Sequence, residues 1–136
     1  RALAETSSHE LVGVLTKPGK PAGRGQKIRQ TPIFDAANEY SLDLVTPNSI
    51  NDDSGQDWLD QKSPDALVVI AYERLLTQRV LSGRFACNLH ASLLPRWRGA
   101  APIQRAILEG DDETGVSVQR MVLALDEGAP WPMDVI

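Results

Sequence analysis

The spacing of apolar and polar residues divides the chain into strand-like and helix-like segments. Residues 66–72 (ALVVIAY) are apolar throughout, which is typical of a strand covered on both faces. Residues 116–122 alternate instead, as in a strand with one covered face. Together with three other short apolar runs they predict five strands, at residues 11–16, 42–46, 66–72, 85–90 and 116–122.

Helices are expected between these strands. Thr31 followed by Pro32 is a helix-start signal, because a threonine hydroxyl can cap the first turn and proline fits the first helical position. That helix should run to about Tyr40. Residues 18–25 hold three Gly and two Pro, so a loop is predicted there. Further helices are expected around Trp58, near residues 75–81, and over residues 102–109 before Gly110.

Strands that alternate with helices predict parallel β-α-β units and an open α/β sheet. In such sheets, ligands bind at the carboxyl ends of the strands. Functional residues are therefore expected just after the strands at 11–16, 66–72, 85–90 and 116–122.

Length and composition fit one globular domain. The 136 residues are 42% hydrophobic and 24% charged, which argues against disorder. No apolar run approaches the roughly 18 residues that a membrane helix needs. With Cys87 as the single cysteine and only two histidines, the chain can form neither an internal disulfide nor the usual structural zinc site.

The charge is unevenly distributed although the net value is only −4. Residues 35–60 carry acidic charges alone, whereas residues 17–29 carry basic charges alone. Such a basic segment in an acidic protein fits a contact with a polyanion, and equally a solvated charged loop. Its members are Lys17, Lys20, Arg24, Lys27 and Arg29.

Asn88 and His90 are the first candidates for chemistry. They lie two positions apart at the end of a predicted strand, so their side chains point to one face. An asparagine amide can donate to a carbonyl oxygen that is becoming an oxyanion, and a histidine can move a proton near neutral pH. The alternative for His90 is a ring bonded to a nearby backbone group.

Two further residues are weaker candidates. Strand alternation places Cys87 on the face opposite His90, so a buried hydrophobic role is favoured over a nucleophilic one. Asp126 follows an apolar strand and could orient His90 or hold a water, or it could be an ordinary turn aspartate. Spacing alone does not pair Asp126 with His90.

The segment from residue 88 to residue 126 resembles the folate-dependent formyltransferase family. The resemblance is carried, in order, by Asn88-x-His90, Ser92-Leu93-Leu94-Pro95, Arg98-Gly99 and Leu125-Asp126-x-Gly128. Residues 96–104 (RWRGAAPIQ) are similar to members that act on methionyl-tRNA, and residues 16–25 (TKPGKPAGRG) to the loop with which those members reach the tRNA acceptor end. The resemblance covers nearly all of residues 10–128.

The resemblance implies an α/β fold, an open, mostly parallel Rossmann-like sheet with flanking helices, whose first strand is missing. It also implies that residues 1–136 are a single formyltransferase catalytic domain, incomplete at both ends and without the C-terminal β-barrel. The full-length protein is expected to be a cytoplasmic monomer, bacterial or organellar, with no membrane contact.

The implied reaction is direct transfer of the formyl group of 10-formyltetrahydrofolate to the amino group of methionyl-tRNA. Asn88 and His90 would stabilise the tetrahedral oxyanion, and His90 with Asp126 would manage the protons, without a metal or a covalent intermediate. Folate would contact Ser92, Leu93, Leu94, Pro95, Val69, Ile70, Ala71 and Tyr72. The tRNA would contact Arg24, Lys20 and Lys27.

Other readings remain open at this point. The chain could be another formyltransferase or hydrolase that uses 10-formyltetrahydrofolate, or a remnant that binds folate without catalysis. Glu73 and Ala129 favour the remnant, because they stand where the family usually has Gly and Asp. A general dinucleotide-binding module is disfavoured, since the chain has no GxGxxG sequence.

Overall fold

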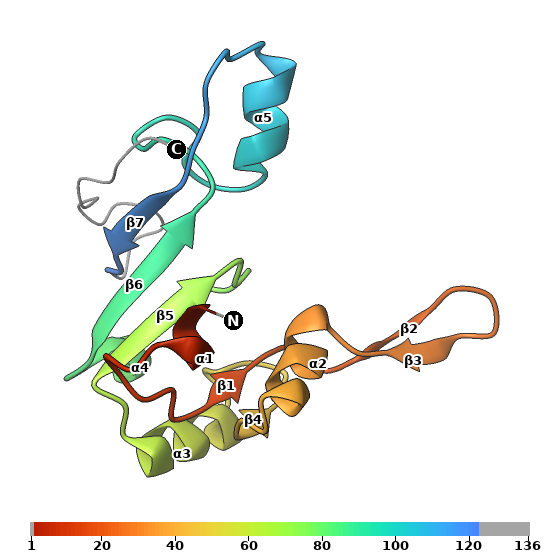
Figure 1. Ribbon diagram of the computed structural model, residues 1–136, viewed down its shortest axis with the longest axis vertical. Helices are drawn as coiled ribbons and strands as arrows, with labels where there is room; N and C mark the ends of the chain where they lie inside the picture. Colours follow the sequence, from red (N-terminus) through yellow and green to blue (C-terminus); the bar gives the residue numbers. More distant parts are fainter. Residues whose placement is uncertain (1, 123–136) are drawn as a thin grey trace. The chain divides into compact units, whose positions relative to one another are not determined.

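The structure is a computed structural model, and it describes residues 2–122. The chain separates into two compact units, Arg1–Pro64 and Asp65–Ile136 (Figure 1). Each unit has its own strands and helices and is described by itself.

The first unit is built on a pair of parallel strands. Strand β1 (Val14–Leu15) pairs with β4 (Leu44–Val45), with Val14 opposite Leu44. The unit also contains helices α1 (Ala2–Glu5), α2 (Pro32–Glu39) and α3 (Asp53–Lys62). The predicted cap of α2 is confirmed, because the Thr31 hydroxyl accepts a hydrogen bond from the Phe34 amide at 3.1 Å.

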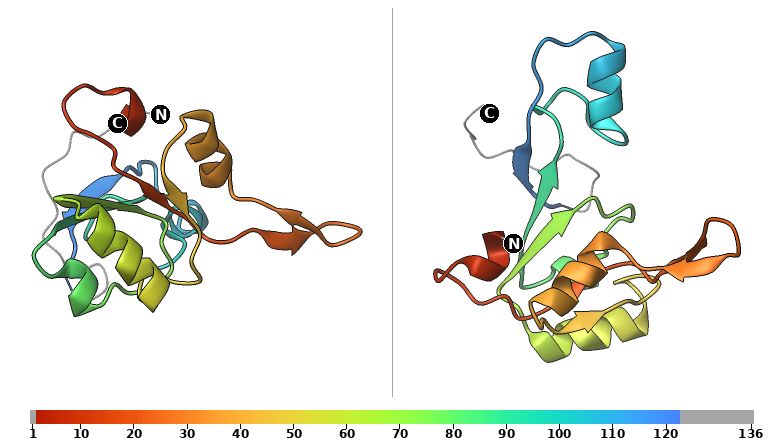
Figure 2. Two further views of the ribbon diagram at one scale, coloured as in Figure 1. Left: turned by 90° about the horizontal axis from the view of Figure 1, so that it is seen from below. Right: turned by 45° about the vertical axis from the view of Figure 1, so that its right-hand side comes forward.

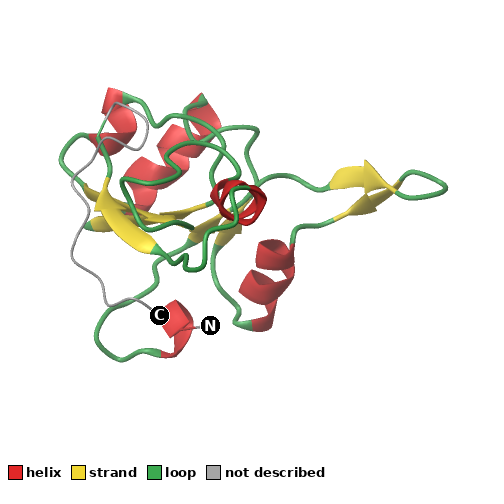
Figure 3. Ribbon diagram, turned by 90° about the horizontal axis from the view of Figure 1, so that it is seen from above, coloured by secondary structure: helices red, strands yellow, loops and turns green. Residues whose placement is uncertain are grey.

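A β-hairpin stands where a loop was predicted at residues 18–25. Strands β2 (Lys20–Ala22) and β3 (Lys27–Arg29) pair antiparallel, with Pro21 opposite Ile28. A two-stranded ribbon consists of edge strands only, where proline is tolerated, so the proline and glycine content did not exclude strands. The hairpin extends away from β1, α2 and β4 within this unit (Figures 2 and 3).

The second unit holds a three-stranded sheet in the order β5-β6-β7. Strands β5 (Ala66–Ile70) and β6 (Phe85–His90) are parallel, as predicted. Helix α4 (Gln78–Leu81) connects them, and helix α5 (Pro102–Leu108) lies between β6 and β7 (Ser117–Arg120) along the chain.

Strand β7 runs antiparallel to β6, which corrects the expectation of a parallel strand at residues 116–122. The reason is visible in Figure 1: α5 lies beyond the carboxyl end of β6, and the chain re-enters the sheet from that same end. The beginning of β7, not its end, therefore lies beside the end of β6, with Ser117 opposite His90.

The two faces of this sheet differ in burial. One face carries Ala86, His90, Ser117 and Gln119, all of them buried. On the other face Val68 is 44% exposed and Ile70 is 59% exposed. The prediction that residues 66–72 are covered on both faces is thus wrong, because the side chains of this second face of β5 are exposed.

The predicted class is confirmed: the fold is α/β, with parallel strand pairs and helices in the connections. Among residues 2–122, no helix has the length and apolar character needed to cross a membrane.

Candidate active site

Asn88 and His90 lie on the better-covered face of the β5-β6-β7 sheet. The register places Asn88 between Val69 of β5 and Gln119 of β7, and His90 beside Ser117. His90 is buried, whereas Asn88 is half-buried. The Asn88 side-chain amide has two N–H groups that can donate to a ligand on this face.

One ring nitrogen of His90 has a defined partner. Nε2 lies 2.9 Å from the main-chain carbonyl oxygen of Trp97. A carbonyl can only accept, so Nε2 carries the hydrogen of this bond. The expectation of a histidine bonded to a nearby backbone group is therefore correct for Nε2. This bond also fixes the plane of the ring at the end of β6.

The segment Ser92–Pro95 leaves the end of β6 as a tightly held loop. Ser92 is fully buried, and its hydroxyl donates to the Arg96 carbonyl at 2.6 Å. Ser117 binds the loop twice, since its hydroxyl donates to the Ser92 carbonyl at 2.7 Å and accepts from the Leu94 amide at 3.0 Å. The Leu94–Pro95 peptide is cis.

Gly115 makes room for this loop. A Cβ atom at that position would lie 2.7 Å from a methyl carbon of Leu93, so the Leu93 side chain would have to move. Neither Gly115 nor Ser117 was identified from the sequence. Their contacts with the Ser92–Pro95 segment become visible only in the structure, where Ser117 lies opposite His90 and Gly115 lies against Leu93.

The second predicted folate segment, Val69–Tyr72, follows the end of β5. Because β5 and β6 are parallel, this segment and Ser92–Pro95 leave the sheet at the same edge. The turn is made by Ala71, which has a φ of 51°. This left-handed position lies two residues before Glu73, which stands where the family usually has Gly.

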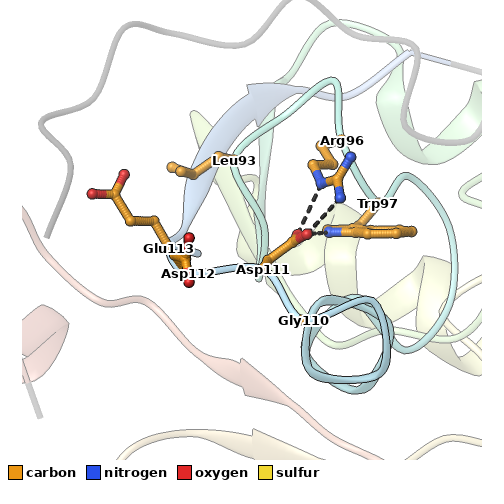
Figure 4. Close-up of a pocket in the computed structure, with 7 residues that line it drawn as sticks. All are labelled: Leu93, Arg96, Trp97, Gly110, Asp111, Asp112 and Glu113. Carbon is orange, nitrogen blue, oxygen red and sulfur yellow. Dashed lines mark hydrogen bonds and ion pairs between the residues drawn. The ribbon is translucent and has the colours of Figure 1, made fainter.

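An ion-paired cluster lies next to the Ser92–Pro95 loop (Figure 4). Asp111 accepts two hydrogen bonds from the Arg96 guanidinium and one from the Trp97 indole N–H, the last at 2.6 Å. These bonds, Arg96 first and Trp97 second, lower the pKa of Asp111 to about 2. The hydrogen bond to Asp111 likewise raises the pKa of Arg96.

This cluster borders a cavity of about 320 Å³. Among the predicted folate residues, only Leu93 lines it. The rest of the lining comes from the loop after β6 and from the residues after α5: Arg96, Trp97, Gly110, Asp111, Asp112 and Glu113.

Cys87 has the environment of a small buried hydrophobe. It is 8% exposed and on the face opposite His90, and burial raises the pKa of its thiol. A raised pKa disfavours the thiolate, which is the nucleophilic form. This supports the non-nucleophilic role expected for Cys87.

The basic residues proposed from the sequence lie on the hairpin of the first unit. Lys20 and Lys27 belong to β2 and β3, and Arg24 lies in the turn that joins them. All three are exposed. Gly23 and Gly25 flank Arg24 with φ values of 68° and 88°, which a tight turn requires.

Asp126 lies outside the described residues, so its predicted pairing with His90 is not tested. The same holds for Ala129. Within residues 2–122 no group of three or more His, Cys, Asp or Glu side chains is arranged to hold a metal ion.

The sequence matches the profile of the formyl transferase family over residues 1–134. The chain belongs to the formyl transferase family. This match spans both compact units. It also agrees with the motif order around Asn88 and His90.

Two curated relatives have the same activity in their names. The chain is 51% identical to a methionyl-tRNA formyltransferase of Methylobacillus flagellatus, over 95% of this chain and 42% of that protein. It is 50% identical to one of Pseudomonas fluorescens, over 90% of this chain and 39% of that protein. The chain thus spans about two fifths of the length of these relatives.

Solved structures agree on the fold. A phosphoribosylglycinamide formyltransferase from Bacillus halodurans matches with a TM-score of 0.70 at 22% identity, over 93% of this chain and 65% of that one. One from Anaplasma phagocytophilum matches with a TM-score of 0.71 at 17% identity, over 95% and 61%. These likenesses support the Rossmann-like formyltransferase fold.

Proposed function

We propose that the protein transfers the formyl group of 10-formyltetrahydrofolate to the amino group of methionyl-tRNA. Membership of the formyl transferase family supports the reaction, and the names of relatives that are about 50% identical support the acceptor. The observation that carries the proposal is local: Asn88 and His90 share one face at the end of β6, directly before the Ser92–Pro95 loop.

The reaction needs one bond to form and one to break at the same carbon. The methionyl nitrogen attacks the formyl carbon, and the carbonyl oxygen becomes negative in a tetrahedral intermediate. Asn88 donates a hydrogen bond to that oxygen through its side-chain amide. His90 takes the proton that the attacking amine releases and returns it to the folate nitrogen as the carbon–nitrogen bond to folate breaks. Electrons and protons balance without a metal.

Asp126 completes this scheme as the carboxylate whose negative charge stabilises the protonated form of His90. That role follows from the motif Leu125-Asp126-x-Gly128 alone.

Two segments are proposed to hold the folate. Residues Ser92–Pro95 and Val69–Tyr72 leave the sheet at one edge, which is the usual ligand edge of parallel strands. The exposed residue Ala71 and the apolar side chains of Leu93 and Leu94 suit a flat pterin ring with polar edges. We assign the tRNA contact to Lys20, Arg24 and Lys27 of the hairpin.

The domain organisation is part of the proposal. The two compact units together would form one formyltransferase catalytic domain, because the family profile extends through both.

The test is formyl transfer to methionyl-tRNA by the protein and by His90→Ala. Loss of a general acid–base group lowers kcat by about a hundredfold or more, so a drop of that size is expected. Cys87→Ala is the matched control, because it alters the same strand on the opposite face and should retain the rate. Wild-type rates in His90→Ala would refute the mechanism. Transfer to another amine but not to methionyl-tRNA would refute the acceptor.

A further inference from the structure

We propose that Trp97 and Asp111 are positioning residues that hold His90 in its Nε2–H tautomer. The inference rests on the proposed function only in that His90 is taken to move the proton. Its structural content, which is the protonation of one ring nitrogen, can be tested without any substrate.

The first step is the bond between the His90 ring and the Trp97 carbonyl. Nε2 and the carbonyl oxygen are 2.9 Å apart, and His90 is only 7% exposed. Since the carbonyl oxygen cannot donate, the neutral ring must place its hydrogen on Nε2. Nδ1 is then the nitrogen that carries the lone pair and accepts the proton during catalysis.

The second step concerns the orientation of that carbonyl. Trp97 has a φ of 61°, a left-handed conformation that is uncommon for a residue other than glycine. Such a conformation persists only where the surroundings enforce it. The carbonyl therefore points at His90 because other contacts hold Trp97 in place.

Asp111 holds Trp97 through a hydrogen bond to its indole ring. Its carboxylate accepts from the indole N–H at 2.6 Å and from Arg96 Nε at 2.8 Å (Figure 4). The Arg96 and Arg105 guanidinium groups lie over the Trp97 ring, 4.3 and 4.9 Å from its centroid. Asp111 is itself anchored to the end of α5, because its amide donates to the Ala106 carbonyl at 3.0 Å.

Neighbouring carbonyls show that the assignment to His90 is specific. The Arg96 carbonyl accepts from the Ser92 hydroxyl at 2.6 Å, and the Arg98 carbonyl accepts from an Arg105 guanidinium nitrogen at 2.8 Å. Three successive carbonyls thus each have a separate donor, and the middle one binds the histidine. A shift of the loop by one residue would break all three bonds.

The resulting chain of contacts runs from α5 through Asp111 and Trp97 to His90. Asp111 and Trp97 take no direct part in the proposed reaction. Its effect is to choose which nitrogen of His90 is free of hydrogen, a property on which proton transfer depends.

The experiment is long-range ¹H–¹⁵N correlation spectroscopy of the histidine rings in the labelled protein. The His90 signals are assigned by their loss in His90→Gln. In the wild type we expect Nδ1 to resonate as an unprotonated nitrogen and Nε2 as a protonated one. The opposite pattern, or an even mixture of tautomers, would overturn the proposal.

The variants are Trp97→Phe, which keeps an aromatic ring without its N–H, and Asp111→Asn, which keeps the size of the side chain without its charge. Both should shift His90 toward a mixture of tautomers and lower kcat by about tenfold, with a smaller change in KM for folate. Asp112→Asn is the matched control, because Asp112 borders the same cavity and has no hydrogen bond within the described residues. It should leave the His90 signals unchanged.

The outcomes separate this inference from the proposed function. An Nε2–H tautomer that depends on Trp97 and Asp111, combined with full activity of His90→Ala, would sustain the inference and refute the catalytic role. An unchanged tautomer in both variants would refute the inference and leave the proposed reaction standing.

Discussion

Asp111 joins two side chains of the loop that follows β6. It binds Arg96 through both carboxylate oxygens and Trp97 through one of them. Although the Arg96 side chain is largely exposed, that of Asp111 is 12% exposed, so water competes with these bonds less at Asp111 than at Arg96. The charged form of Asp111 is therefore the form that the folded loop requires.

This predicts an acid-sensitive contribution to stability. The pKa of Asp111 is about 2 in the folded chain and 3.8 for an ordinary aspartate. A lowered carboxyl pKa stabilises the fold fully above the ordinary value, and the contribution is lost as pH falls toward the folded value. Wild type should resist urea better than Asp111→Asn at neutral pH, and the difference in midpoint should shrink toward about pH 2. A difference that stays constant over this range would contradict the assignment, and Asp112→Asn should show none.

The sequence predicted correctly which residues share a face when they belong to a single strand. Alternation along β6 was enough to bring Asn88 and His90 to one face and to set Cys87 apart from them. The partners of His90 could not be found in this way. The Trp97 carbonyl reaches the ring through a left-handed residue, and Ser117 reaches the loop through the register of another strand. Neither feature has a signal in residue spacing.

At the scale of elements, local sequence signals predicted where β6 and α2 begin. They did not predict the direction of β7 or the β2–β3 hairpin. Strand β6 has its predicted bounds, and α2 begins after its predicted cap. The predicted direction of β7 was wrong, because α5 lies beyond the carboxyl end of β6 and the chain returns to the sheet from that end (Figure 1). The β2–β3 hairpin was missed because proline and glycine in residues 18–25 indicate a turn as readily as an edge ribbon.

The hairpin carries its own prediction. Arg24 lies at its turn and is exposed, so replacing it with Ala removes one phosphate contact without disturbing buried structure. The KM for methionyl-tRNA should rise, and the slope of log affinity against log salt should fall by about 1. Folate binding, measured by titration, should not change.

Arg24→Lys is the matched control for this prediction, since it keeps the charge and should retain most of the affinity for tRNA. An Arg24→Ala variant that lost folate binding, or that used methionyl-tRNA with unchanged KM, would remove the hairpin from the proposed tRNA contact.

At the scale of the whole chain, the α/β class follows from the order of its elements, and the family profile covers residues 1–134. What the order of elements could not predict is which sheet face is covered. In the second unit, Val68, Ile70 and Phe85 share one face, since Ala66 pairs with Phe85 and Val68 with Cys87. Their exposed fractions are 44%, 59% and 41%. An open apolar face of this kind contributes little hydrophobic stabilisation to the unit.

The 136-residue chain by itself is therefore predicted to be marginally stable. It should bind the dye 8-anilinonaphthalene-1-sulfonate, which fluoresces on apolar surfaces, and its calorimetric melt should be broad. Val68→Thr, which keeps the shape of the side chain and adds a hydroxyl, should lower the dye fluorescence while the circular dichroism stays the same. A sharp melt at high temperature with no dye binding would show that the apolar face of β5 is covered in solution, and that the exposed face is not what limits the stability of the chain.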